Sequence, residues 1–134
     1  FRQADDTLPV AITISFSFPG GHTMMGNDGA EVAQRLQDAG ADIIGANCGE
    51  PDSLLTAVEA MAPEAQAPMM AQANAGVPQL VDGKQAFSWG PEEAAELAEK
   101  LLRLGVRIIG GCCGTTPAHI AKIAEVAAAF NRVN

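Results

Sequence analysis

Three cysteines carry the clearest chemistry in this sequence. Cys112 and Cys113 are adjacent, and Cys48 lies 65 residues before Cys113. The nine residues that end in Cys48 align without a gap on the nine residues, 105–113, that end in Cys113. Each segment has a glycine followed by a short apolar run, so the repeat predicts that all three thiols leave equivalent strand ends. Thiols that converge in this way suit a metal better than a disulfide.

Zinc is the metal that best suits three thiolates. It is tetrahedral, redox-inactive and tolerant of sulfur, and a catalytic zinc keeps its fourth position for water or substrate. Two other interpretations stay open. In the first, the cysteines act simply as small buried apolar residues. In the second, Cys112 and Cys113 form a redox dithiol. Against the dithiol, adjacent cysteines form a strained ring when oxidised, and the sequence has no Cys-x-x-Cys.

Strand and helix patterns alternate along the chain. We predict strands over 10–18, 42–46, 68–73 and 106–110, and helices over 30–39, 52–61, 91–104 and 117–130. Asn27 or Asp28 is expected to cap the first helix, and Asp52 or Ser53 the second. Residues 74–90 are expected to form a long loop, because glycine and proline recur there.

Alternating strands and helices predict parallel pairing through right-handed crossovers. Such units build either an open doubly wound sheet or a (β/α)8 barrel, of which four units make one half. In a barrel, alternate strands share a layer of side chains, which fits cysteines on the second and fourth strands. A free half-barrel would expose two strand edges, so we expect another half in the same polypeptide or in a partner chain. An open four-stranded sheet is the alternative.

Composition excludes several kinds of partner. The chain has 134 residues, enough for one domain over 1–134, and we expect it to be part of a longer polypeptide. Its net charge of −8 and its lack of a basic cluster make nucleic acids and anionic membrane surfaces poor partners. The apolar run at 10–18 is too short to cross a bilayer. An odd cysteine count without a secretory signal favours reduced thiols and a cytoplasmic location.

Two motifs together resemble the metal-binding motifs of the homocysteine S-methyltransferases. They are Gly-Ala-Asn-Cys at 45–48 and Gly-Gly-Cys-Cys-Gly-Thr-Thr-Pro at 110–117, with further likeness at 23–26, 74–76 and 90–92. This family includes betaine–homocysteine methyltransferase and the homocysteine-binding domain of cobalamin-dependent methionine synthase. The likeness spans nearly the whole chain but covers only the second half of the family's barrel, strands 5–8.

The resemblance implies both a fold and a reaction. The chain would be the C-terminal half of a TIM-type barrel, in which Cys48, Cys112 and Cys113 hold zinc and homocysteine takes the fourth position. The homocysteine thiolate would attack an activated methyl group and leave as methionine, with betaine, S-methylmethionine or a methylcorrinoid as the donor. Asn74 would lie near the open coordination position, and Asn47 would support its loop or bond a sulfur.

The chain also departs from the family pattern. In the family, the residues that bind the amino acid part of homocysteine belong to the first half of the barrel, which this sequence lacks. We therefore expect this chain to hold metal better than substrate, with weak or no turnover by itself. A non-catalytic zinc- or thiol-binding half-barrel that needs a partner half is the alternative. His119 is expected to cap or pack rather than bind metal, and Met24 and Met25 to pack within their loop.

Overall fold

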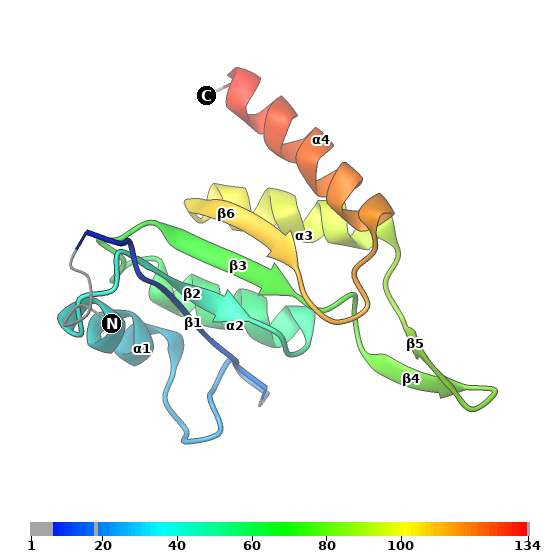
Figure 1. Ribbon diagram of the computed structural model, residues 1–134, viewed down its shortest axis with the longest axis horizontal. Coiled ribbons are helices and arrows are strands. Elements are labelled where there is room, and N and C mark those ends of the chain that lie inside the picture. Colours follow the sequence, from blue (N-terminus) through cyan, green and yellow to red (C-terminus); the bar gives the residue numbers. More distant parts are fainter. Residues whose placement is uncertain (1–6, 18, 134) are drawn as a thin grey trace.

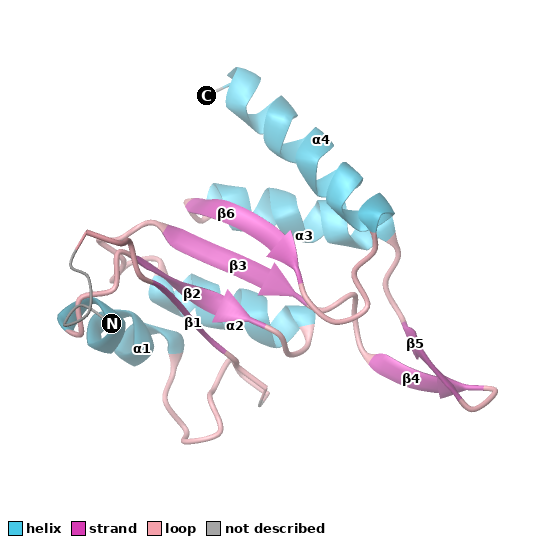
Figure 2. Cartoon of the chain, in the orientation of Figure 1, coloured by secondary structure: helices cyan, strands magenta, loops and turns pink. Residues whose placement is uncertain are grey.

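A sheet of four parallel strands and the helices that connect them make up most of the molecule (Figure 1, Figure 2). The structure is a computed structural model that describes residues 7–17 and 19–133. The strands of the sheet are β1 (Ala11–Ile14), β2 (Ile43–Asn47), β3 (Met69–Ala73) and β6 (Val106–Gly111). The helices are α1 (Gly29–Asp38), α2 (Pro51–Met61), α3 (Pro91–Arg103) and α4 (Pro117–Val133). Strands β4 (Pro78–Val81) and β5 (Lys84–Phe87) form a separate antiparallel hairpin.

The strand order distinguishes the two architectures that the sequence left open. The order is β1-β2-β3-β6, so each new strand is added on the same side of the one before it. Right-handed crossovers then place the connecting helices on one face of the sheet, and α2 and α3 lie behind the sheet in Figure 1. A doubly wound sheet would reverse its order and carry helices on both faces. The described residues thus form an α/β half-barrel, and the prediction of βα units in a barrel is confirmed.

Burial along the strands shows which face is the core. In β3, Met69, Ala71 and Ala73 are buried, whereas Met70 and Gln72, which alternate with them, are only half-buried. The buried set packs with side chains from α2 and α3, including Leu54 and Leu101. Alternation of this kind is typical of a sheet that is covered on one face. The half-buried face corresponds to the interior of a barrel.

Helices α1 and α2 touch at a position where only glycine fits. Gly29 is the buried first residue of α1, and a Cβ there would overlap the carbonyl oxygen of Ala57 on α2. Gly29→Ala is therefore expected to lower the free energy of unfolding by about 1–3 kcal/mol, the usual cost of overpacking. Urea unfolding followed by circular dichroism measures this loss.

Gly90→Ala is the matched control for this substitution. A Cβ at Gly90 would meet only the flexible carboxylate of Glu93, at 3.3 Å. The urea midpoint of Gly90→Ala should therefore stay close to that of the unaltered chain. Equal midpoints for the two variants would contradict the close contact between α1 and α2.

The prediction of a long loop over 74–90 needs correction, because this segment contains the β4–β5 hairpin. The two strands are antiparallel, and the pair nearest the turn is Val81 with Lys84. Asp82 and Gly83 form the two-residue connection. Both connecting residues have positive φ, +50° and +73°. Asp-Gly favours this kind of turn, so a signal for the hairpin was present in the sequence. The hairpin projects from the carboxyl edge of the sheet in Figure 1.

Three smaller predictions also need correction. Strand β1 ends at Ile14 rather than at residue 18, because its pairing with β2 stops there; residue 18 itself lies outside the described residues. Glu50, not Asp52 or Ser53, precedes α2, because Pro51 takes the first helical position. The methionines at 24 and 25 do not pack in their loop, since they are 80% and 87% exposed. The cap of α1 by Asp28 is confirmed, with Glu31 N–H donating to its carboxylate at 2.9 Å.

An apolar strip remains open beside β6, at one edge of the sheet. Helix α4 packs on α3 and leans away from β6 (Figure 1), and Ile108 and Ile120 are 37% and 44% exposed along the groove between them. Such a strip is expected where a barrel would continue with another strand.

Of the helices in the described part of the chain, none combines the length and the apolar character needed to cross a membrane.

Candidate metal centre

The three cysteines converge, as the repeat predicted. Cys48 directly follows β2, and Cys112 and Cys113 directly follow β6. All three sulfur atoms lie within 4.8 Å of one another, and the sulfurs of the adjacent pair are 4.0 Å apart. Cys48 and Cys112 are half-buried and Cys113 is exposed. The site therefore sits at the carboxyl edge of the sheet, the edge at which barrels carry their active sites.

Strand β3 brings the two cysteine loops together. It lies between β2 and β6, so the loops approach its carboxyl end from opposite sides. The Cys48 N–H donates to the Gln72 carbonyl at 2.9 Å, and the Cys112 N–H donates to the Ala73 carbonyl at 2.8 Å. Successive carbonyls of a strand point in opposite directions, so one strand end can anchor both loops. This role of β3 was not predicted from the sequence.

Asn74, the residue after β3, contacts both cysteine loops. Its side-chain oxygen accepts from the Cys113 N–H at 3.0 Å, and its side chain also helps to lower the pKa of the Cys48 thiol. The next residue continues the contact, since the Ala75 N–H donates to the Cys113 carbonyl at 2.9 Å. Asn47 is half-buried at the end of β2 and is paired in register with Gln72. The expected roles of Asn74 at the open coordination position and of Asn47 in the loop stay predictions.

Both cysteine loops turn through left-handed backbone conformations. Cys48 has φ +60° and is followed by Gly49 at φ +71°. On the other side, Gly114 has φ +78°, and a Cβ there would overlap the ring of Phe87 from the hairpin. The hairpin exit thus packs directly on the loop that carries the cysteine pair. Glycine at 114 allows both the turn and this contact.

The thiols differ in their acidity. Burial by itself raises the pKa of Cys48, but hydrogen bonds from the Gly49 backbone, the Asn74 side chain and the two other thiols bring that pKa below the usual cysteine value. The pKa of Cys112 is raised, mainly by burial and further by the Cys113 thiol and the negative charges of its neighbours, against the hydrogen bond from the Cys113 backbone. Cys48 is therefore expected to become a thiolate before Cys112 as the pH rises.

The donor set and its spacing fit zinc. A zinc–sulfur bond of about 2.3 Å in a tetrahedral arrangement places the sulfurs roughly 3.8 Å apart. The adjacent thiols stand at 4.0 Å, and all three are within 4.8 Å, so small side-chain movements bring them to that spacing. Three soft sulfur donors without a carboxylate select against magnesium and calcium. The arrangement leaves a fourth position for another ligand.

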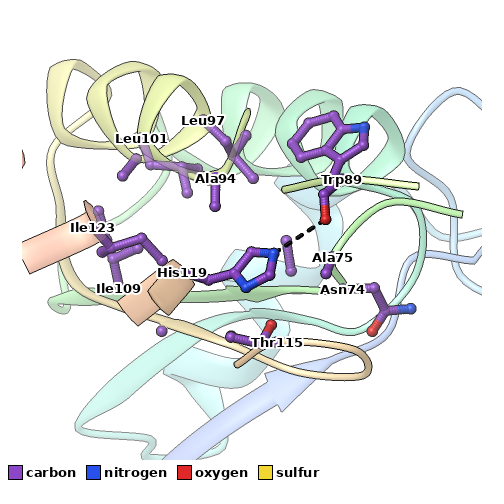
Figure 3. Close-up of a pocket in the computed structure, with 14 residues that line it drawn as sticks. Asn74, Ala75, Trp89, Ala94, Leu97, Leu101, Ile109, Thr115, His119 and Ile123 are labelled. Atoms are coloured by element: carbon purple, nitrogen blue, oxygen red, sulfur yellow. Dashed lines mark hydrogen bonds between the residues drawn. The ribbon is translucent and has the colours of Figure 1, made fainter. Parts of the chain in front are cut away.

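His119 has the capping role that the sequence predicted for it. Its side chain is buried, at 6% exposure, in a small pocket that Asn74 and Thr115 also line (Figure 3). The Thr116 N–H at the start of α4 donates to its Nδ1 at 3.2 Å, and its Nε2 bonds the Trp89 carbonyl at 3.1 Å. Both ring nitrogens are thus engaged away from the thiols.

Comparisons with known proteins agree with this site. The sequence profile of the homocysteine S-methyltransferase family matches residues 1–127. Methionine synthase of Mycobacterium leprae is 34% identical over 134 residues, covering 98% of this chain and 11% of that protein. Betaine–homocysteine S-methyltransferase 1 of Rattus norvegicus is 35% identical over 137 residues, covering 87% of this chain and 33% of that protein. The chain thus spans about a tenth to a third of the length of these relatives.

Solved structures support the fold. The apo form of the homocysteine methyltransferase MmuM from Escherichia coli superposes with a TM-score of 0.71 at 21% identity, covering 93% of this chain and 41% of that one. Its metallated form also gives a TM-score of 0.71 at 21% identity, over 92% and 38% of the two chains. At this identity the likeness concerns the fold, of which the chain forms one part. Because the family profile covers nearly all of its residues, the chain belongs to the homocysteine S-methyltransferase family.

Proposed function

We propose that this chain is the zinc-binding, C-terminal half of a homocysteine S-methyltransferase barrel, which moves a methyl group to the thiol of homocysteine to give methionine. The observation that carries the proposal is the convergence of three thiols within 4.8 Å at the carboxyl edge of a parallel sheet, in a chain of this family. The same thiols in a chain without the family match would support only a metal site.

In this proposal Cys48, Cys112 and Cys113 hold the metal and leave one coordination position to the substrate. Zinc, when bound, lowers the pKa of a coordinated thiol and so keeps homocysteine as a thiolate at neutral pH. Asn74 supports the loop of the cysteine pair by accepting from the Cys113 N–H, and it lowers the pKa of the Cys48 thiol on the other loop. The homocysteine sulfur then attacks the methyl carbon of the donor in an in-line displacement, which releases the demethylated donor.

The rest of the active site comes from outside this chain. The open strip beside β6 and the small share of each relative that the chain covers both support a second half-barrel, in the same or another polypeptide. That half would bind the amino and carboxylate groups of homocysteine. Betaine, S-methylmethionine or a methylcorrinoid would serve as donor. Reduced thiols are required throughout, which favours the cytoplasm.

Metal analysis of the purified chain tests the proposal. We expect one zinc per chain under reducing conditions, with three thiols protected from alkylating reagents while the metal is bound. With Co²⁺ in place of zinc, homocysteine should increase the sulfur-to-cobalt charge-transfer absorption, because a fourth thiolate joins the three from the protein. Homoserine, which has a hydroxyl in place of the homocysteine thiol, is the control ligand and should leave this absorption unchanged.

Two outcomes would contradict the proposal in different ways. A metal-free protein with a reversible disulfide between Cys112 and Cys113 would favour the dithiol interpretation. One bound metal that does not respond to millimolar homocysteine would favour the non-catalytic half-barrel, since no coordination position would then be open to the substrate thiol.

A further inference from the structure

A closed ring of hydrogen bonds fixes the loop of the cysteine pair. The Ala75 N–H donates to the Cys113 carbonyl at 2.9 Å, and the Trp89 N–H donates to the Ala75 carbonyl at 3.0 Å. His119 bonds the Trp89 carbonyl at 3.1 Å and the Thr116 N–H at 3.2 Å. The backbone from 113 to 116 closes the ring. Three segments that are distant in the sequence therefore depend on one another.

The imidazole of His119 is the only side chain in this ring, and its tautomer follows from its partners. The Trp89 carbonyl can only accept, so Nε2 carries the hydrogen, and Nδ1 of the neutral ring is the acceptor for the Thr116 N–H. Thr116 and His119 stand at the cap and third positions of α4, where a side chain that reaches back to the cap N–H completes a capping box. His119 does this with Nδ1 while Nε2 reaches the hairpin exit, as the dashed line in Figure 3 shows.

We propose that His119 is a positioning residue for the metal site, because its Nε2–H bond to Trp89 holds the Cys113 backbone in place. The part of this inference that concerns metal binding rests on the proposed function. It differs from a helix-capping role, which needs only Nδ1 and Thr116. The pocket around the ring supports it: the imidazole is buried, and Thr115 and Asn74 line the same pocket. Loss of the Nε2 bond would leave the Trp89 carbonyl without its partner and loosen the contact from Trp89 through Ala75 to Cys113.

Two neutral substitutions separate the positioning role from capping. In His119→Gln the amide nitrogen takes the place of Nε2 and can still donate to Trp89. In His119→Asn the side-chain oxygen takes the place of Nδ1 and can still cap α4, but the side chain is too short to reach Trp89. Thr116→Ala is the control, because it removes the hydroxyl that bonds His119 Nδ1 at 2.8 Å at the helix cap and keeps both groups of the Nε2 bond to Trp89.

The first readout is Co²⁺ binding to the 134-residue chain, followed by its charge-transfer spectrum. We expect His119→Asn to weaken Co²⁺ binding by about 10- to 100-fold, as is usual for the loss of a residue that orients metal ligands. His119→Gln and Thr116→Ala should bind Co²⁺ nearly as well as the unaltered chain, even where Thr116→Ala lowers the urea midpoint.

The second readout needs no metal. Hydrogen exchange at the Ala75 and Trp89 amides should speed up in His119→Asn and stay slow in His119→Gln. Equal Co²⁺ affinity and equal exchange in the two His119 variants would overturn the positioning role. An equal loss of affinity in Thr116→Ala would also overturn it, because capping alone would then explain the effect. If the unaltered chain bound no Co²⁺, the proposed function would fail, and the exchange rates would still decide the role of His119.

Discussion

Cys48→Ser is expected to abolish stable zinc binding, although two of the three cysteines remain. Cys112 and Cys113 both follow β6, so Cys48 is the only thiol that comes from the β2 side of the site. Without it the metal keeps two adjacent thiols and no longer connects the two loops. The loss should exceed about 100-fold in affinity, the upper range for residues that only support the ligands. Competition with a chelator of known affinity measures the change.

The same variant should lose its stabilisation by metal. A ligand that binds only the folded state at 1,000 times its dissociation constant adds about 4 kcal/mol to the free energy of unfolding. The unaltered chain should gain an amount of this order when zinc is added, and Cys48→Ser should gain almost none. Glu59→Gln, at an exposed position on α2, is the control and should respond to zinc normally. Unchanged zinc affinity in Cys48→Ser would show that the three thiols do not form one site.

The chain by itself is expected to produce methionine more than about 100-fold more slowly than a complete relative, even when it is fully loaded with zinc. Orientation of both reactants provides much of the rate of such a displacement, and small misplacements already cost about 100-fold. Here the half-barrel that would hold the rest of homocysteine and the donor lies outside the chain. Methionine formation from homocysteine, with betaine or S-methylmethionine supplied in turn, measures the rate.

A chimera provides the complementary test. This chain can replace the matching third of the rat betaine–homocysteine enzyme, with which it shares 35% identity. We expect the chimera to form methionine from betaine, and the same chimera with Cys48→Ser to be inactive. If the isolated chain alone turned over as fast as the intact rat enzyme, a second half-barrel would not be needed, and the proposed division of the active site would be wrong.

The convergence of the thiols was predictable from the sequence, because each cysteine position is defined by the short strand segment before it. Strands β2 and β6 are each followed directly by a cysteine, and the repeat predicts that these two strands are equivalent. The capping role of His119 was predictable for the same reason, since Thr116 is only three residues away. The signal for His119 thus lies in one short segment, and the signal for the thiols lies in the comparison of two short segments.

The remaining features depend on pairing between distant segments. The same succession of strands and helices fits a barrel or a doubly wound sheet, and only the order β1-β2-β3-β6 separates them. The bond between Asn74 and the Cys113 N–H joins residues 39 positions apart. Anchoring of both cysteine loops by β3 likewise requires that β3 lie between β2 and β6. None of these neighbours can be read from one segment alone.

The backbone conformation of Cys48 has a consequence for how the metal site is maintained. A φ of +60° costs an ordinary residue about 1 kcal/mol or more, whereas glycine adopts it freely. A metal-free chain would therefore be more stable with glycine at 48, and selection for folding alone would remove this ligand. In the proposed zinc site, the free energy gained by holding metal would offset this cost. At position 48 of the proposed site, backbone stability therefore favours glycine, whereas metal binding requires cysteine.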